Sequence, residues 1–221
     1  ASLWNDEIEG IQASIQSTGG SVDNAELLAD GEVEIAFMGA VPAYQSYNNL
    51  GQFADKPEGR YQEVGFVSQK YPNPQNFVAM QWASDIDSLR DIEGQRVSKG
   101  MVASQGEFVF NQILDYLGWS YDDVIPEDTV HQSAIEQVRN RQIDAIVWPD
   151  GIPSPSITEI METGFARLVS YDEDLIEAMT EDTLDFPFTI PANTYPNQPE
   201  EVQTWAGSAV LVARLDVPEE V

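Results

Sequence analysis

Apolar and polar positions follow helix-like and strand-like spacings in turn along the chain. The spacing predicts a strand at residues 11–15, a helix at residues 21–29 and a buried strand at residues 33–38. Together these segments form a predicted β-α-β unit with short connections. The same alternation continues with a short helix at residues 41–47 and strands at residues 64–68, 77–82 and 96–99.

A second series of elements occupies the remainder of the chain. It comprises predicted helices at residues 104–117, 133–141 and 155–163, and strands at residues 143–147 and 209–213. Gly118 and Gly164 follow two of these helices, where glycine commonly ends a helix. Strands that alternate regularly with helices predict an α/β fold with mainly parallel sheets flanked by helices.

The net charge limits the classes of partner. The 221 residues carry 38 acidic and 10 basic side chains, a formal net charge of −28, spread along the whole chain. Such a surface repels phosphate backbones and anionic membrane surfaces, which excludes nucleic acid as a partner. Only three lysines occur, a balance typical of proteins from salt-loving microbes; the alternative is an ordinary acidic exported protein.

The chain has no cysteine, which excludes disulfides, thiolate metal sites and a cysteine nucleophile. No apolar run reaches membrane-spanning length. The sequence opens on Ala1 without an initiator methionine, so we expect that a leader peptide could have been removed.

Several short motifs follow one another in order along the chain. They begin with Thr-Gly-Gly-Ser at residues 18–21, then Asn24, Leu-Leu at 27–28, Gly31 and a short apolar strand. Further matching segments lie at residues 43–44, 89–98, 142–145 and 151–159, and Ile-Pro-Ala-Asn-Thr-Tyr-Pro occupies residues 190–196. In this order the motifs resemble those of the TAXI-type receptors of tripartite ATP-independent (TRAP) transporters, and the matching segments cover most of the chain.

This resemblance implies a two-lobed fold of the periplasmic-binding-protein type (type II-like), with an anionic solute held between the lobes. Residues 1–89 and 191–221 would form lobe 1, and residues 90–190 lobe 2. Compared with the family, the chain would lack the first strand of lobe 1 and the helices after the final strand. The implied role is extracytoplasmic capture of a glutamate-like amino acid or organic acid for TRAP permease membrane subunits, with a lipid anchor as an option.

The loop before residue 104 is a candidate anion site. Ser104, Gln105 and Gly106 open a predicted helix, where backbone N–H groups and the helix dipole favour a carboxylate. The alternative is structural, because Ser104 and Glu107 also form a capping-box pattern. Glu107 in addition would repel an anionic solute.

Other candidates lie in loops and at element ends. Each has a structural alternative: helix capping for Ser21, packing for Trp148 and Tyr44, and solvated surface for Asp150. The full set of further ligand-binding candidates is Thr18, Gly20, Ser21, Met38, Tyr44, Trp148, Asp150 and Pro153.

An enzyme is not predicted. The single histidine, His131, falls in a predicted loop with no metal-ligand spacing, and adjacent acidic pairs are typical of solvated charge. We therefore expect no catalytic residue, metal or cofactor. The alternatives are a ligand-sensing domain or an enzyme on the same two-lobed fold, or an exported protein that has lost its ligand site.

Overall fold

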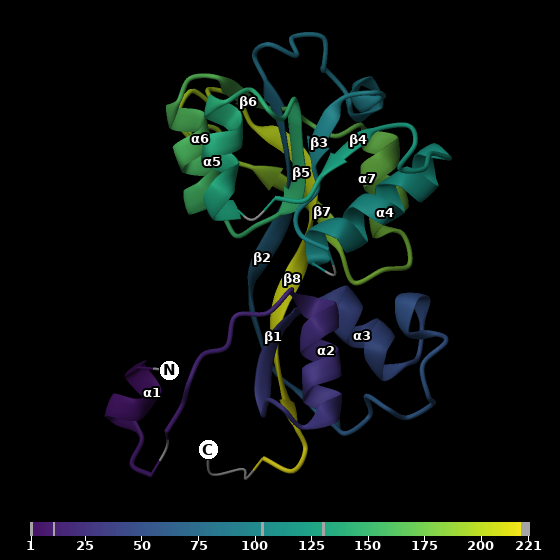
Figure 1. Cartoon of the computed structure of the whole chain (residues 1–221), viewed down its shortest axis with the longest axis vertical. Coiled ribbons are helices and arrows are strands. Elements are labelled where there is room, and N and C mark those ends of the chain that lie inside the picture. Colours follow the sequence, from purple (N-terminus) through teal and green to yellow (C-terminus); the bar gives the residue numbers. More distant parts are fainter. Residues whose placement is uncertain (1, 11, 103, 130, 218–221) are drawn as a thin grey trace.

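Two long strands join the two lobes of the protein. The computed structural model describes residues 2–10, 12–102, 104–129 and 131–217. Strands β2 (Val64–Met80) and β8 (Val202–Arg214) pair antiparallel and run through both lobes (Figure 1). The strand order is β1-β8-β2-β5-β3-β4, with β6 paired to β2 and β7 to β8. The predicted α/β fold with a helix-flanked sheet is confirmed.

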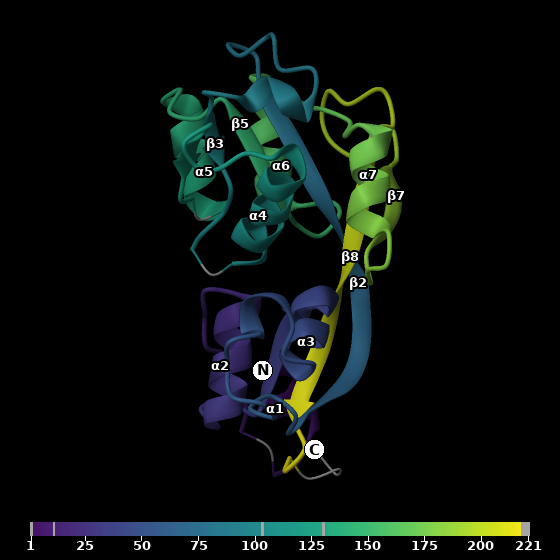
Figure 2. The same cartoon turned by 90° about the vertical axis from the view of Figure 1, so that its right-hand side faces the viewer.

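The small lobe contains the first elements of the chain and one end of each long strand (Figure 2). Its elements are α2 (Ser21–Asp30), β1 (Ile35–Gly39), α3 (Ala40–Tyr47) and the 3-10 turn Gly51–Phe53. β1 pairs with β8 from Ile35↔Ala213 to Gly39↔Ala209. The core between this sheet and α2 contains Ala25, Leu28, Ala36, Met38, Phe53, Tyr61, Val210 and Val212. Helix α1 (Ser2–Glu7) lies beside this lobe (Figure 1).

The large lobe contains most of the other elements. Its strands are β3 (Arg96–Ser98), β4 (Ile125–Glu127), β5 (Ala145–Pro149), β6 (Ala166–Leu168) and β7 (Phe186–Ile190). Its helices are the 3-10 turn Leu89–Ile92, α4 (Gln105–Leu117), α5 (His131–Arg139), α6 (Pro155–Glu162) and α7 (Glu173–Thr180). His131, expected in a loop, is the first residue of α5.

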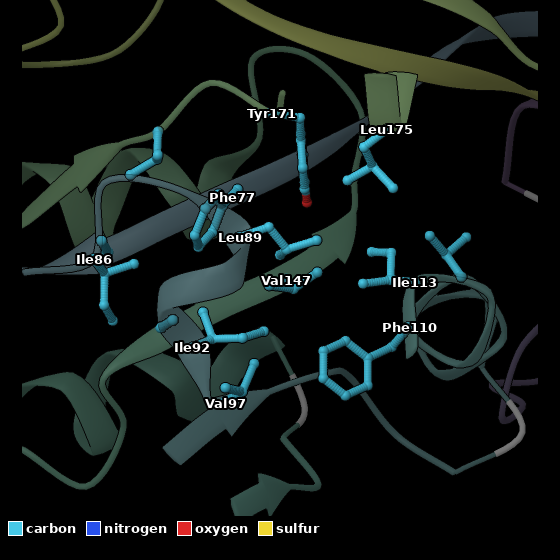
Figure 3. Packing of buried hydrophobic residues seen from close by; sticks show 14 of the residues in the cluster. Phe77, Ile86, Leu89, Ile92, Val97, Phe110, Ile113, Val147, Tyr171 and Leu175 are labelled. Carbon is cyan, nitrogen blue, oxygen red and sulfur yellow. The ribbon is translucent and has the colours of Figure 1, made fainter. Parts of the chain in front are cut away.

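The sheet of the large lobe is buried on both faces. Successive residues of β5 alternate between two hydrophobic clusters: Val147 packs on the α4 and α7 side, and Ile146 on the α5 and α6 side. Figure 3 shows the first of these clusters around Phe77, Phe110 and Val147. Burial on both faces explains why β5 is a continuous apolar run in the sequence.

The expectation of mainly parallel sheets is wrong. Among the described residues five of the seven strand pairings are antiparallel, and only β3–β4 and β3–β5 are parallel. These two pairs are linked through the crossover helices α4 and α5, as parallel pairs require. The long strands β2 and β8 contribute antiparallel pairs in both lobes.

The predicted strand at residues 11–15 is also wrong within the described part of the chain. Residues 12–18 have no regular secondary structure, and Ile15 is 81% exposed; Ile11 lies outside the described residues. By contrast, the strands predicted at residues 64–68 and 77–82 are parts of one strand, β2. Pro72 and Pro74 interrupt the sequence pattern, but among the described residues β2 pairs only with β8 at these two positions, and an edge position tolerates proline.

The packing clusters bear on where the lobes divide. Phe77 and Leu89 pack in the large lobe, whereas Val210 and Val212 pack in the small lobe. Trp205, on the same strand as Val210, belongs to the large-lobe core. The boundaries expected at residues 89 and 190 stay a prediction; these clusters favour boundaries inside β2 and β8.

Candidate functional site

Gln105, the first residue of α4, bridges the two lobes. Its side-chain oxygen accepts a hydrogen bond from Asn73 Nδ2 on β2 at 3.2 Å. A Cβ atom on Gly39, at the end of β1, would lie only 2.7 Å from Gln105 Nε2. Gly39 therefore leaves the space that the Gln105 side chain occupies, and the start of α4 lies against the small lobe.

Three helices begin close to this contact. Gly39 is the N-cap of α3, and its N–H donates to Ser21 Oγ, in the first residue of α2, at 2.9 Å. Nearby, a Cβ atom on Gly19 would lie 3.6 Å from the carbonyl oxygen of Val102, in the loop before α4. The N-termini of α2, α3 and α4 thus meet where the lobes meet. Helix N-termini carry partial positive charge and free N–H groups, an arrangement that suits an anionic group.

The first predicted loop, residues 18–21, lies at this junction. Gly20, rather than Ser21, is the N-cap of α2, and its φ of 127° requires glycine. Ser21 is buried, and its hydroxyl holds the Gly39 amide instead of capping the helix. The capping role expected for Ser21 is therefore wrong. Thr18, the first residue of this loop, lies half-buried beside the junction.

Ser104 acts as the N-cap of α4, because its hydroxyl accepts from the Glu107 N–H at 3.3 Å. Glu107 in turn accepts from Lys99 Nζ at 2.8 Å. Lys99 also pairs with Asp128 at 2.7 Å, and its side chain is only 5% exposed. Burial by itself lowers the pKa of Lys99, but its hydrogen bonds to Asp128 and Glu107 outweigh burial and raise it. Lys99 thus offsets the negative charge with which Glu107 was expected to repel an anion.

Gly106 has a packing role at the same helix start. A Cβ atom there would lie 2.5 Å from the Lys99 carbonyl oxygen and 3.3 Å from Trp148 Cβ. We expect Gly106→Ala to lower the free energy of unfolding by about 1–3 kcal/mol, because the backbone must shift to relieve the clash. Urea unfolding checks this, with Gly118→Asn as the control, since a Cβ atom at Gly118 has open space and asparagine tolerates its positive φ. Equal stability of Gly106→Ala and the wild type would contradict the clash.

The loop after β5 is held by its own hydrogen bonds. The Asp150 carboxylate accepts from Gly151 N at 2.8 Å, Ser154 Oγ at 2.6 Å and Ser156 Oγ at 3.2 Å. Pro153 follows a cis peptide bond and is exposed. Because the Asp150 carboxylate accepts three hydrogen bonds from its own loop, its role in this structure is to stabilise the loop.

The remaining candidates divide between core and surface. Trp148 is 1% exposed within the core, so its ring packs against protein and not against a solute in this conformation. Met38 is likewise buried, in the small-lobe cluster. Tyr44, on α3, is about half exposed. Of these three side chains, only that of Tyr44 is open to solvent.

Three further residues at the lobe junction, Asn73, Gly207 and Asp185, were not predicted from the sequence. A Cβ atom on Gly207, in β8, would lie 2.8 Å from Asp185 Oδ1 and 3.7 Å from Gln105 Nε2. Asp185 therefore lies at the lobe junction beside Gln105. Burial raises the pKa of its carboxyl group to about 6. In a chain with 38 acidic residues no local pattern distinguishes Asp185 from solvated carboxylates.

Two surface cavities lie away from this junction. One, of about 420 Å³, is lined by Asp30, Gly31, Arg60, Glu63, Arg214 and Asp216 at the far end of the small lobe. The other, of about 340 Å³, lies on the large lobe beside Arg167, Ser170 and Gln198. Neither contains a predicted ligand-binding residue. Within the described ranges no cluster of three or more His, Asp or Glu side chains is placed to hold a metal ion, and no helix is long and apolar enough to cross a membrane.

Solved structures with a similar fold are binding proteins. The alkanesulfonate-binding protein SsuA from Xanthomonas axonopodis pv. citri, bound to MOPS, is 16% identical with a TM-score of 0.50, over 89% of this chain and 53% of that one. The periplasmic aliphatic sulphonate binding protein SsuA from Escherichia coli is 14% identical with a TM-score of 0.54, over 96% and 58%. The GluR0 ligand-binding core in complex with L-glutamate is 10% identical with a TM-score of 0.50, over 99% and 76%.

These similarities establish the two-lobed fold, and this chain spans little more than half the length of the two SsuA proteins. The family assignment covers the full length of the chain. Since residues 1–221 match the NMT1-like family throughout, the chain belongs to that family.

Proposed function

We propose that this chain is an extracytoplasmic solute-binding protein that captures a small carboxylate between its lobes and delivers it to the membrane subunits of a TRAP permease. The observation that carries the proposal is the meeting of the α2, α3 and α4 N-termini at the lobe junction, around Ser21, Gly39 and Gln105. Three sets of helix-start N–H groups favour one small anion there.

The names of the three similar structures described above support a ligand that carries an acidic group. Their names report MOPS, which is a sulfonate, aliphatic sulphonates and L-glutamate, and each of these carries an acidic group. The TRAP permease as partner rests on the motif resemblance at residues 18–31 and 190–196. A membrane permease also fits the NMT1-like family and the binding-protein fold.

The geometry also supports hinged closure. Among the described strands, only β2 and β8 continue from one lobe into the other (Figure 2), so a change of a few backbone angles in these two strands would rotate one lobe toward the other. β2 has register irregularities between Phe66 and Ser68 and between Gln69 and Pro72, where such a change is easiest.

Calorimetric titration of the full-length protein tests the ligand class. We expect at least one of L-glutamate, glutarate and succinate to bind with a dissociation constant of about 1 μM or tighter, a binding free energy near −8 kcal/mol. Glucose and putrescine serve as neutral and cationic controls. Binding of glucose or putrescine but of no acid would overturn the proposal. Small-angle scattering at saturation should show a smaller radius of gyration than without ligand.

A further inference from the structure

Asp185 places a carboxylate at the lobe junction. It directly precedes β7, and its Oδ1 and Gln105 Nε2 both lie within 4 Å of the position that a Cβ atom on Gly207 would take. Gly207 pairs with Asn73, whose side chain donates to Gln105. The carboxylate therefore lies on the side of the crossing strands that α4 covers, next to the helix starts described above.

Among the described residues, Asp185 has no basic side chain as an ion-pair partner. Eight of the ten Lys and Arg side chains form ion pairs in this part of the chain, and none of these ion pairs includes Asp185. Its backbone N–H donates to Thr183 Oγ1 at 3.1 Å, so the local turn is held independently of the carboxylate. A partly buried carboxylate without a cation destabilises the folded protein. Such a cost at a junction of lobes is typical of a group that awaits a ligand.

A second, independent feature points the same way. Gln75 is 1% exposed, and neither its Oε1 nor its Nε2 has a hydrogen-bond partner among the described residues. Because side chains on a strand alternate, Gln75 lies on the same face of β2 as Asn73, two residues away. A buried amide without a partner costs about 1–3 kcal/mol. A polar solute beside Asn73 and Gln105 would supply the missing donor and acceptor.

We propose that Asp185 binds an ammonium group of the solute, so that the preferred solute is a zwitterionic acid and not a plain carboxylate. In this arrangement the solute carboxylate lies at the starts of α2, α3 and α4, and its ammonium group between Asp185 and the amide oxygens of the junction. The inference rests on the proposed function. Asp150, the other candidate for an amine, is already engaged by three donors of its own loop. A single carboxylate among amides suits an ammonium ion better than a divalent metal.

Matched pairs of solutes that differ only in the ammonium group test the proposal. Calorimetry would compare L-glutamate with glutarate, L-alanine with propionate and L-leucine with 4-methylpentanoate. For whichever pair binds, we expect the amino acid to bind at least tenfold more tightly to the wild type. Asp185→Asn should weaken binding of the amino acid by about 30-fold or more and change that of the plain acid by less than threefold.

Asp182→Asn is the matched control, because it removes a carboxylate from the same segment at an exposed position whose positive φ asparagine tolerates. It should leave both affinities unchanged. If no acid binds the wild type, the proposed function fails. If glutarate binds as tightly as L-glutamate, or Asp185→Asn weakens both equally, the role of Asp185 is overturned while the proposed function stands.

The stability of Asp185→Asn without solute provides a second readout. In the folded protein the pKa of the Asp185 carboxyl group is about 6, above its ordinary value of 3.8. The charged carboxylate therefore lowers the stability of the folded protein above pH 6. This loss of stability decreases as the pH falls from 6 toward 4. The neighbours named above, Gln105, Gly207 and Thr183, are uncharged. Asp185→Asn should therefore raise the thermal midpoint at pH 8 and leave it nearly unchanged at pH 4. A lower midpoint at pH 8 would indicate a structural role and overturn the proposal.

Discussion

The thermal midpoint of unfolding should rise steeply as sodium chloride is increased from 0.01 M toward 1 M. The net charge is −28, and most Lys and Arg side chains already form ion pairs, so the excess carboxylates repel one another with few cations left to offset them. The screening length falls from about 30 Å at 0.01 M to about 3 Å at 1 M salt. If screening of this repulsion raises the free energy of unfolding by about 2 kcal/mol, the thermal midpoint rises by roughly 4–8 °C.

A melting series in sodium chloride measures this rise, and potassium chloride is the control. The two salts should act alike if screening is the cause, and the curve should flatten once neighbouring carboxylates are screened. A midpoint that stays flat or falls with salt would contradict both the repulsion argument and the salt-loving habitat proposed from the composition.

Lys99→Met should be among the most destabilising single changes at a charged position. Lys99 is nearly fully buried and pairs with both Glu107 and Asp128, at 2.8 and 2.7 Å, and its ammonium lies 5.7 Å from the centre of the Tyr121 ring. Removing it leaves the Glu107 and Asp128 carboxylates close together without the Lys99 ammonium group between them. Breaking a buried ion pair in this way costs about 3 kcal/mol, which lowers the midpoint by roughly 6–12 °C.

Lys56→Met is the control matched in charge. Lys56 pairs with Glu26 on the surface, and Glu26 keeps Arg60 as a second partner, so this variant should unfold close to the wild type. Addition of Glu107→Gln to Lys99→Met should restore part of the lost free energy of unfolding, because one of the two neighbouring carboxylates is then neutral. Urea unfolding at a fixed salt concentration measures all four proteins. Equal losses in the two single variants would show that net charge, and not the buried pair, sets the cost.

Most helix ends were predictable because their signals are local; the start of α2 is an exception, since Gly20 and not Ser21 is its N-cap. Ser104 and Ser154 cap α4 and α6 through their side chains, and Gly31 and Gly118 end α2 and α4 in the left-handed conformation. Each signal depends on a few neighbouring residues. The apolar run at β5 was likewise readable, since a strand buried on both faces needs no alternation.

Strand pairing was not predictable from the same information. Alternation at residues 12–15 is a valid strand pattern, but a strand forms only with a partner, and the described residues pair none with it. In β2 the two prolines look like a break, yet the continuous β8 alongside keeps Val64–Met80 in one strand. The direction of most pairings followed from these two long strands and not from the order of helices and strands.

The sequence by itself determined that this is an α/β protein with a strongly acidic composition, and it indicated the helix start at residues 104–106 as a candidate anion site, because propensity, capping and charge are local or additive properties. Only the tertiary structure decided which polar groups are free to act. Asp150 is engaged by its own loop, and Trp148 is buried, whereas Asp185 lies beside Gln105 and Gly207. Asp185 and Gln105 are separated by 80 positions in the chain, so no local pattern shows that they lie together.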